Sequence, residues 1–243
     1  MTKPIVAGIA DIANLGLCDV ALERALSRTT SLPGRVCFYG PSGYGKSMSA
    51  CWVANSRRAY YVQARSVWTK KDTLKAIIHE MGVHTPTNAT AAALVDAIAS
   101  ELAITGRPLI IDEMDHLVAK GSVELIRDIY EASQAPILLI GEEMLPTKLK
   151  RFERFHGRVL NWVPAQPVSL EDAKRLAPIY SKVTIHEDLL KHVVKMANGS
   201  VRRVAVSLDL ISETAITEGM AAVDLAAWGK RELYTGDAPK RRA

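Results

Sequence analysis

The chain has 243 residues, of which 48% are hydrophobic and 23% charged, and its formal net charge is +5 at pH 7. This composition is ordinary for a soluble globular protein, and no apolar run reaches the roughly 20 residues that span a bilayer, so we expect no membrane partner. The three cysteines do not pair evenly and have no metal-type spacing, which favours a reduced, cytoplasmic compartment.

Apolar runs that predict buried strands alternate along the chain with patterns that predict helices. The strands are expected at residues 35–40, 59–64, 108–113 and 135–142, and the helices between them at 46–55, 72–81, 91–103 and 122–132. Thr69 and Asp72 have the spacing of a capping box, which marks a helix start. This alternation predicts an α/β fold with a parallel sheet and helices on both faces.

The strand signal stops at about Pro164. Four helical patterns follow, beginning at residues 169, 186, 200 and 221, and the second ends at Gly199. We therefore expect three parts, which are an αβα domain over residues 1–163, a small all-helical domain over 164–235, and a mobile tail over 236–243.

A glycine-rich loop follows the first expected strand. Residues 40–47 fit the pattern G-x-x-x-x-G-K-[ST] and precede an expected helix. Glycines let backbone N–H groups face phosphate oxygens, Lys46 would reach the β- and γ-phosphates, and the Ser47 hydroxyl would ligate Mg²⁺. Rather than an unliganded turn, we predict a site for ATP and Mg²⁺ with contacts from Gly40, Pro41, Ser42, Gly43, Tyr44, Gly45, Lys46, Ser47 and Met48.

An acidic pair follows the third expected strand. Asp112 ends an apolar run, where a carboxylate can hold the Mg²⁺ shell, and Glu113 is suited to polarise the attacking water. Isolated Asp-Glu pairs are usually solvated, but this pair ends a buried strand downstream of a phosphate loop. The two features together predict a phosphate-loop NTPase.

These motifs and the helical segment after them resemble the AAA+ ATPases over nearly the whole chain, with Walker A at Gly40–Ser47, Walker B at Leu109–Glu113 and a helical lid. The resemblance implies an active site between subunits, where a neighbour donates an arginine to the γ-phosphate. The segment 148–159 resembles the one that carries this arginine, which would be Arg154 or, as second choice, Arg151.

The same resemblance implies a phosphate-contacting arginine in the lid. Residues 199–204 resemble the sensor 2 segment, in which this residue would be Arg202. Residues 144–203 hold 12 Lys/Arg against 5 Asp/Glu. This basic excess would serve nucleotide phosphates or face DNA, or it is a solvated surface in which Arg158 and Arg203 make ordinary pairs.

One segment departs from the AAA+ pattern. The fourth expected strand should end with a small polar sensor 1 residue, but Gly141 and Glu142 occupy the candidate positions. A carboxylate facing a γ-phosphate would repel it unless it is protonated or turned away. With Glu142 placed in the nucleotide site, we expect slow hydrolysis that DNA or a partner stimulates.

The motif YGPSGYGKS, the compact lid and the short length are most similar to the phage Mu B-type transposition ATPases of Mu-like phages and insertion sequences. That resemblance implies ATP-dependent binding of double-stranded DNA, self-assembly as a helical filament or ring, and delivery of target DNA to a transposase. It also implies the cytoplasm of a bacterial host if the chain is phage-encoded. With the phosphate loop starting at Gly40, no helix-turn-helix module is expected before it, so DNA contact would fall to the ATPase domain.

Two loops are candidates for this DNA contact. The loop 64–72 follows the second strand and the loop 116–122 follows the third. They contribute the candidate residues Arg65, Trp68, Thr69, Lys70, Lys71 and Lys120. Such cations suit phosphate contacts, which give affinity without sequence specificity. Solvated loop lysines with Trp68 in the core are the alternative.

Two other functions stay open. The first is a helicase-loader or clamp-loader-like AAA+ ATPase that acts on a protein partner. The second is a non-enzymatic, nucleotide-dependent scaffold, which stays possible because the polar residue expected at sensor 1 is missing. Filaments on bare duplex would separate the first from a transposition ATPase.

Overall fold

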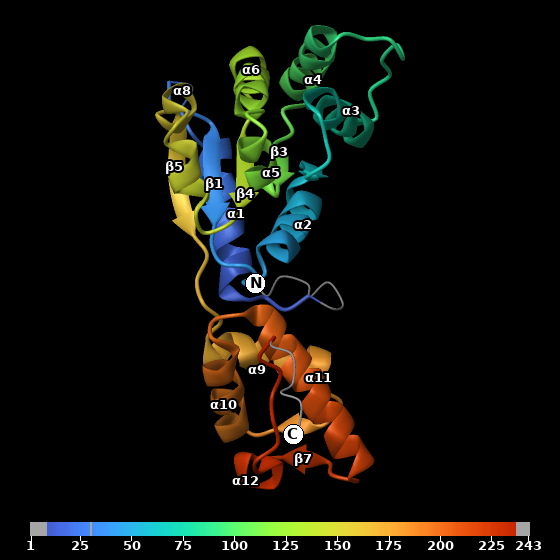
Figure 1. The fold of residues 1–243 in the computed structure, drawn as a ribbon, viewed down its shortest axis with the longest axis vertical. Helices are drawn as coiled ribbons and strands as arrows, with labels where there is room; N and C mark the ends of the chain where they lie inside the picture. The colour runs from blue at the N-terminus through green and yellow to red at the C-terminus, as the bar shows by residue number, and fades with distance from the viewer. Residues whose placement is uncertain (1–8, 30, 237–243) are drawn as a thin grey trace, which may run out of the picture. The chain divides into compact units, whose positions relative to one another are not determined.

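The computed structural model describes residues 9–29 and 31–236. These residues form two compact units (Figure 1). The larger unit comprises residues 17–41 and 46–165. The smaller comprises residues 166–236, the described residues up to Gly16, and Ser42–Gly45. No helix within the described ranges is long and apolar enough to cross a membrane.

The larger unit contains a five-stranded parallel sheet with the strand order β2-β3-β4-β1-β5. The strands are β1 (Arg35–Tyr39), β2 (Tyr60–Gln63), β3 (Leu109–Asp112), β4 (Ile137–Gly141) and β5 (Val159–Pro164). The central strands β3 and β4 are buried along their whole length, as expected for a parallel sheet covered by helices. Tyr39 lies opposite Gly141, and Gln63 lies opposite Asp112, so these strands end together at one edge. The predicted α/β fold is confirmed.

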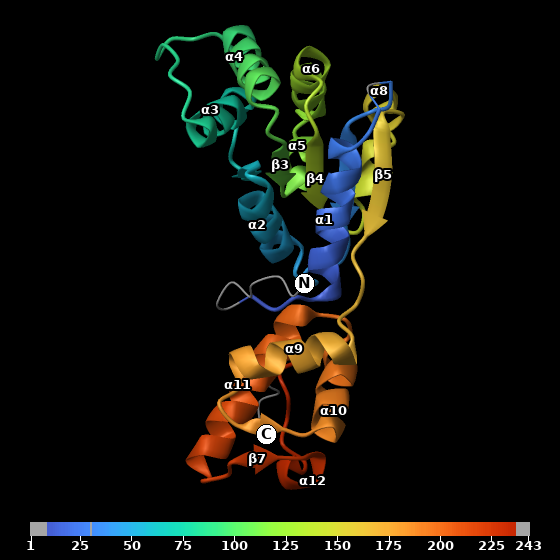
Figure 2. The same ribbon diagram turned by 180° about the vertical axis from the view of Figure 1, so that it is seen from behind.

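Helices flank this sheet, and Figure 2 shows α1 in front of it. They are α1 (Ala13–Leu26), which begins in the smaller unit, α2 (Lys46–Arg57), α3 (Lys70–Met81), α4 (Ala91–Thr105), α5 (Met114–Ala119), α6 (Val123–Ser133), α7 (Leu145–Leu149) and α8 (Glu153–His156). α4 packs against both α3 and α6. The core between these helices and the sheet is built from aliphatic side chains such as Leu74, Ile98 and Ile126, which are almost completely buried.

Capping boxes set the starts of two helices. Thr69 Oγ1 accepts the N–H of Asp72 at 3.2 Å, and the Asp72 carboxylate accepts the N–H of Thr69 at 2.9 Å, so the predicted start of α3 is confirmed. α3 ends at Gly82, whose φ of 68° is left-handed and suits glycine. The same box, formed by Ser169 and Asp172, begins α9 (Leu170–Tyr180) in the smaller unit.

Strand β5 is missing from the predicted strands. Its sequence, VLNWVP, forms the edge strand next to β1 and is half-buried along most of its length. A polar Asn161 and a terminal Pro164 weaken the apolar pattern, and proline is tolerated at sheet edges. The strand therefore depends on pairing with a segment more than 120 residues earlier in the chain.

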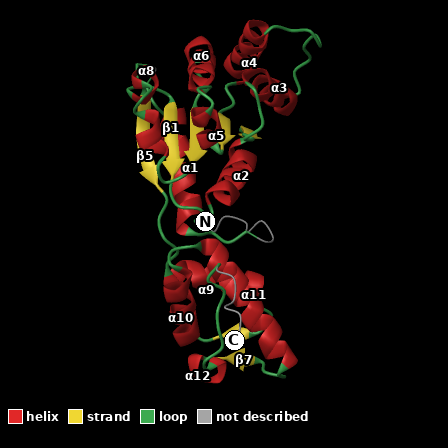
Figure 3. Cartoon of the chain, in the orientation of Figure 1, coloured by secondary structure: helices red, strands yellow, loops and turns green. Residues whose placement is uncertain are grey.

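The smaller unit contains the helices α9 (Leu170–Tyr180), α10 (Glu187–Ala197), α11 (Val201–Thr217) and α12 (Leu225–Trp228). Two corrections apply here. First, β6 (Thr184–Ile185) and β7 (Ala222–Val223) form a short parallel pair, so the unit is not all-helical (Figure 3). Second, the helix expected from residue 221 has only four residues, because Gly229, with a φ of 66°, ends it. Apart from Gly236, the expected mobile tail lies outside the described residues.

Candidate functional site

The phosphate loop joins β1 to α2. Gly43 and Gly45 have φ values of 85° and 82°, which side-chain-bearing residues rarely adopt, so the loop needs glycine at both positions. Lys46, the first residue of α2, donates from Nζ to the carbonyl oxygens of Gly40 at 2.7 Å and Pro41 at 2.8 Å. The lysine is thus folded over the start of its own loop, with its ammonium at the N-terminus of a twelve-residue helix. That arrangement favours an anion.

The tip of the loop belongs to the smaller unit and is held there by backbone contacts. The Gly43 carbonyl accepts the N–H of Arg202 at 3.1 Å, and the Tyr44 carbonyl accepts Asn14 Nδ2 at 2.8 Å. A Cβ added at Gly43 would overlap the Ser200 hydroxyl. The first turn of α11, which carries Arg202, therefore lies directly on the loop. The Arg202 side chain is exposed.

Asp112 is the last residue of β3 and is 1% exposed. Its Oδ1 accepts the N–H of Glu113 and its Oδ2 accepts the Tyr61 hydroxyl, both at 2.8 Å. Burial and the neighbouring Asp112 raise the pKa of Tyr61, so this phenol remains a hydrogen-bond donor. Tyr61 was not among the predicted site residues, because only the pairing of β2 with β3 brings it to the carboxylate.

Glu113 lies between β3 and α5 in a left-handed backbone conformation, with φ 55° and ψ 41°. Non-glycine residues held in this region cluster at functional sites. Burial, followed by repulsion from Asp112, raises the pKa of the Glu113 carboxyl. Both effects bring the carboxyl closer to the pKa of an effective general base.

Magnesium is implied by the motifs, and the donor set fits it only in part. Ser47 and Asp112 supply a hydroxyl and a carboxylate, which are the hard oxygen donors that Mg²⁺ prefers. Within the described ranges, no group of three or more acidic, histidine or cysteine side chains could hold a metal ion alone. These residues therefore suit a Mg²⁺ ion that shares its ligands with substrate phosphates.

Two opposing effects act on the pKa of the Lys46 ammonium at this edge of the sheet. Burial lowers the pKa of its ammonium, and four carboxylates counteract that effect, namely those of Asp112, Glu113, Asp115 and Glu142. The acidic residues therefore lie within electrostatic range of the phosphate loop. Glu142 is not isolated, because its carboxylate lies 3.1 Å from Lys148 Nζ.

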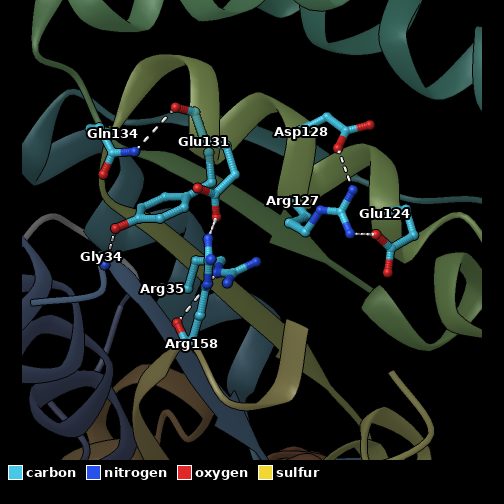
Figure 4. A network of polar contacts seen from close by, with 9 residues as sticks. Gly34, Arg35, Glu124, Arg127, Asp128, Glu131, Gln134 and Arg158 are labelled. Carbon is cyan, nitrogen blue, oxygen red and sulfur yellow. Dashed lines mark hydrogen bonds and ion pairs between the residues drawn. The ribbon is translucent and has the colours of Figure 1, made fainter. Parts of the chain in front are cut away.

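The three arginines near α8 differ in their partners. Arg151 stacks on Phe152 and donates to the Val118 carbonyl, and Arg158 forms an ion pair with Glu131 (Figure 4). Arg154 is exposed and makes no hydrogen bond or ion pair within the described part of the chain. Among the residues that the structure describes, the Arg154 guanidinium thus has no partner, unlike those of Arg151 and Arg158, as an arginine offered to another molecule requires.

A buried arginine supports the helix that carries Arg154. Arg35 is completely buried, and its guanidinium lies 4.3 Å from the centre of the Phe155 ring and 4.9 Å from that of Tyr130. Burial lowers the pKa of Arg35 to about 10. Its terminal nitrogens have no hydrogen-bond partner among the described residues, so the two rings are its main favourable contacts. Phe155, itself fully buried, fixes α8 on this stack.

The two segments predicted as DNA-contacting loops meet in the structure, but residues 116–119 of the second belong to helix α5 and not to a loop. Lys120 Nζ donates to the Trp68 carbonyl at 2.9 Å, and Arg65 lies over the Trp68 ring at 5.6 Å. Trp68 is half-buried and packs against the core, which agrees with the alternative interpretation of this residue as a core residue. The Thr69 hydroxyl donates to Asp72 in the capping box. Lys70 and Lys71 are exposed in the first turn of α3. The cationic groups of this surface are therefore Arg65 and Lys120, which contact Trp68, and Lys70 and Lys71, which have no partner among the described residues.

The fold is that of a phosphate-loop AAA+ domain, with the loop after β1 and the acidic pair after β3 on one edge of the sheet. Residues 29–149 match a family described as "AAA domain". A comparison with curated proteins found no match.

Solved structures share this fold. Orc1 of Aeropyrum pernix in complex with DNA is 21% identical with a TM-score of 0.62, covering 87% of this chain and 61% of that one. Cdc6p of Pyrobaculum aerophilum is 12% identical with a TM-score of 0.63, covering 90% and 66%. Drosophila ORC bound to DNA is 15% identical with a TM-score of 0.56, covering 92% and 66%. This chain therefore spans about three fifths to two thirds of the length of these similar structures.

Proposed function

We propose that the protein is a Mg²⁺-dependent ATPase that binds double-stranded DNA largely without sequence preference when ATP is bound. The observation that carries the DNA-binding part is the hydrogen bond from Lys120 to the Trp68 carbonyl. It joins the end of α5 to the loop after β2, and so groups Arg65, Lys70, Lys71 and Lys120 on one surface. Cations grouped in this way suit phosphate contacts. Orc1 and ORC, two similar structures with DNA bound, add support.

In this proposal the phosphate loop binds the triphosphate through its backbone N–H groups and Lys46. Ser47 and Asp112 hold Mg²⁺, which supplies charge neutralisation for the phosphates. Glu113 orients and polarises the attacking water. Arg202, on the helix that contacts the loop tip, contacts phosphate from within the same chain.

We further propose that the protein assembles with itself on DNA as a filament or ring and delivers target DNA to a transposase in the bacterial cytoplasm. Arg154 of one copy would then reach the γ-phosphate of the next. The choice of Arg154 is supported by the contrast with Arg151 and Arg158, whose guanidinium groups have partners in their own chain. The resemblance of the phosphate loop to those of the Mu B-type ATPases supports the transposition role.

The test is electron microscopy and salt-titrated binding to a duplex, with ATP, with a slowly hydrolysed analogue and without nucleotide. We expect nucleotide-dependent filaments on DNA. Removing Lys70, Lys71 and Lys120 together should flatten the dependence of affinity on salt by about 0.9 logarithmic units per lost phosphate contact. The control is the triple alanine variant of Arg24, Arg58 and Lys230, which are exposed cations outside both loops and outside residues 144–203. Closed rings that ignore DNA would instead favour a loader-type ATPase with a protein partner.

A further inference from the structure

A buried carboxylate connects α5 to the place where the AAA+ pattern expects a polar sensor 1 residue. Asp115 is 7% exposed, and its Oδ2 accepts the backbone N–H of Glu142 at 2.7 Å. Its Oδ1 lies 2.7 Å from Lys148 Nζ, which also lies 3.1 Å from Glu142 Oε2. One carboxylate and one ammonium thus hold together α5, the residue after β4, and α7.

The glycine that ends β4 makes room for this cluster. A Cβ at Gly141 would overlap Asp115 Oδ2 and would also meet the Leu145 side chain. A small polar residue at this position would displace the Asp115 carboxylate. The position of the Asp115 carboxylate therefore requires that residue 141 has no side chain.

The cluster also acts on the groups of the nucleotide site. Asp115 and Glu142 both favour the charged form of Lys46, and Glu142 adds to burial and Asp112 in raising the pKa of Glu113. Hydrogen bonds to Asp115 and Glu142 raise the pKa of Lys148, so its positive charge persists at neutral pH. Gly40, the first residue of the phosphate loop, donates its N–H to the Gly141 carbonyl at 3.4 Å, so Glu142 follows directly after a residue that contacts the loop. Lys148 is the counterion of its carboxylate.

We propose that Lys148, positioned by Asp115, neutralises Glu142 and thereby makes the sensor 1 position compatible with a γ-phosphate. The inference rests on the proposed ATP site. With Lys148 present, its ammonium offsets one of the two carboxylate charges of Asp115 and Glu142 that the γ-phosphate faces. Without it, neither carboxylate charge is offset, and like charges repel. The repulsion acts on ATP more than on ADP, because only ATP carries the third phosphate. Lys148 and Asp115 are positioning residues in this account.

The test is the affinity of the full chain for ADP and for a slowly hydrolysed ATP analogue in Mg²⁺. Lys148→Met should weaken binding of the ATP analogue about tenfold, the effect of one uncompensated charge at a partly solvated site, and leave ADP binding within about twofold. Adding Glu142→Gln to this variant should restore the affinity for the ATP analogue. The matched control is Lys150→Met, which removes an exposed lysine two residues away and should change neither affinity.

The outcomes separate a charge role from a structural one. Equal losses for both nucleotides would overturn the inference, because a folding defect lowers the affinities for ATP and ADP alike. Failure of Glu142→Gln to restore binding would also overturn it. Lack of ATP binding by the unsubstituted protein would refute the proposed function and this inference with it. Unaltered nucleotide selectivity in Lys148→Met would refute the inference alone.

Discussion

Gly43 is the loop position at which a side chain should be most harmful. Its φ of 85° lies where alanine is strained, which costs about 1–2 kcal/mol. A Cβ would also overlap the hydroxyl of Ser200, which caps α11 by accepting the N–H of Arg203 at 3.2 Å. Displacing a cap costs about 1 kcal/mol. For Gly43→Ala the two effects together give about 2–3 kcal/mol.

If ATP binds the loop in this conformation, that free energy corresponds to an affinity about 30–160 times weaker. Titration calorimetry with ATP and Mg²⁺ measures it directly. The matched control is Gly82→Ala, where φ is 68° but no atom lies within 4 Å of the added Cβ. It should lower the melting temperature and leave ATP affinity unchanged.

A double variant isolates the steric part. Ser200→Ala alone should cost about 1 kcal/mol through loss of the α11 cap, but in the Gly43→Ala background it should add little further loss, because the cap is already displaced there. ATP binding by Gly43→Ala within about threefold of the unsubstituted protein would refute the reasoning. The loop would then bind nucleotide in a different conformation, or not at all.

The remaining predictions concern catalysis and folding. Glu113→Gln should bind ATP but trap the ATP-bound assembly on DNA, seen as loss of phosphate release, whereas unchanged disassembly would favour a non-enzymatic scaffold. Because burial raises the pKa of Glu113, the ATPase rate should fall with falling pH at values above the ordinary 4.5 of a glutamate, and a profile flat down to that value would contradict its role as base. Arg154→Ala should reduce assembly-dependent hydrolysis by about 10³-fold or more with an unchanged melting temperature, whereas Arg151→Ala should mainly lower the melting temperature by breaking its bond to the Val118 carbonyl. Thr69→Ala should lower the melting temperature by about 2–4 °C through loss of the α3 cap while DNA affinity persists, and a large loss of DNA affinity would show that Thr69 contacts DNA.

Local structure and binding sites were predictable from the sequence where a few neighbouring residues determine them by themselves. The phosphate loop needs glycine at Gly43 and Gly45 for conformational reasons, and Lys46 follows at a fixed spacing before a helix. The capping box of Thr69 and Asp72 is likewise contained within four residues. The four strands with strong apolar runs, and hence the α/β fold, follow from such patterns.

Only the tertiary structure decided which distant residues share a partner. Asp115 and Lys148 lie 33 positions apart and meet because β3 and β4 pair in parallel, and Tyr61 reaches Asp112 through the pairing of β2 with β3. The resemblance ranks Arg154 ahead of Arg151 as a partner for another subunit, and the tertiary structure adds a physical reason, the contact of Arg151 with Val118. Spacing along a chain specifies helix faces and turns, but contacts across a sheet depend on strand order and register, which no short pattern contains.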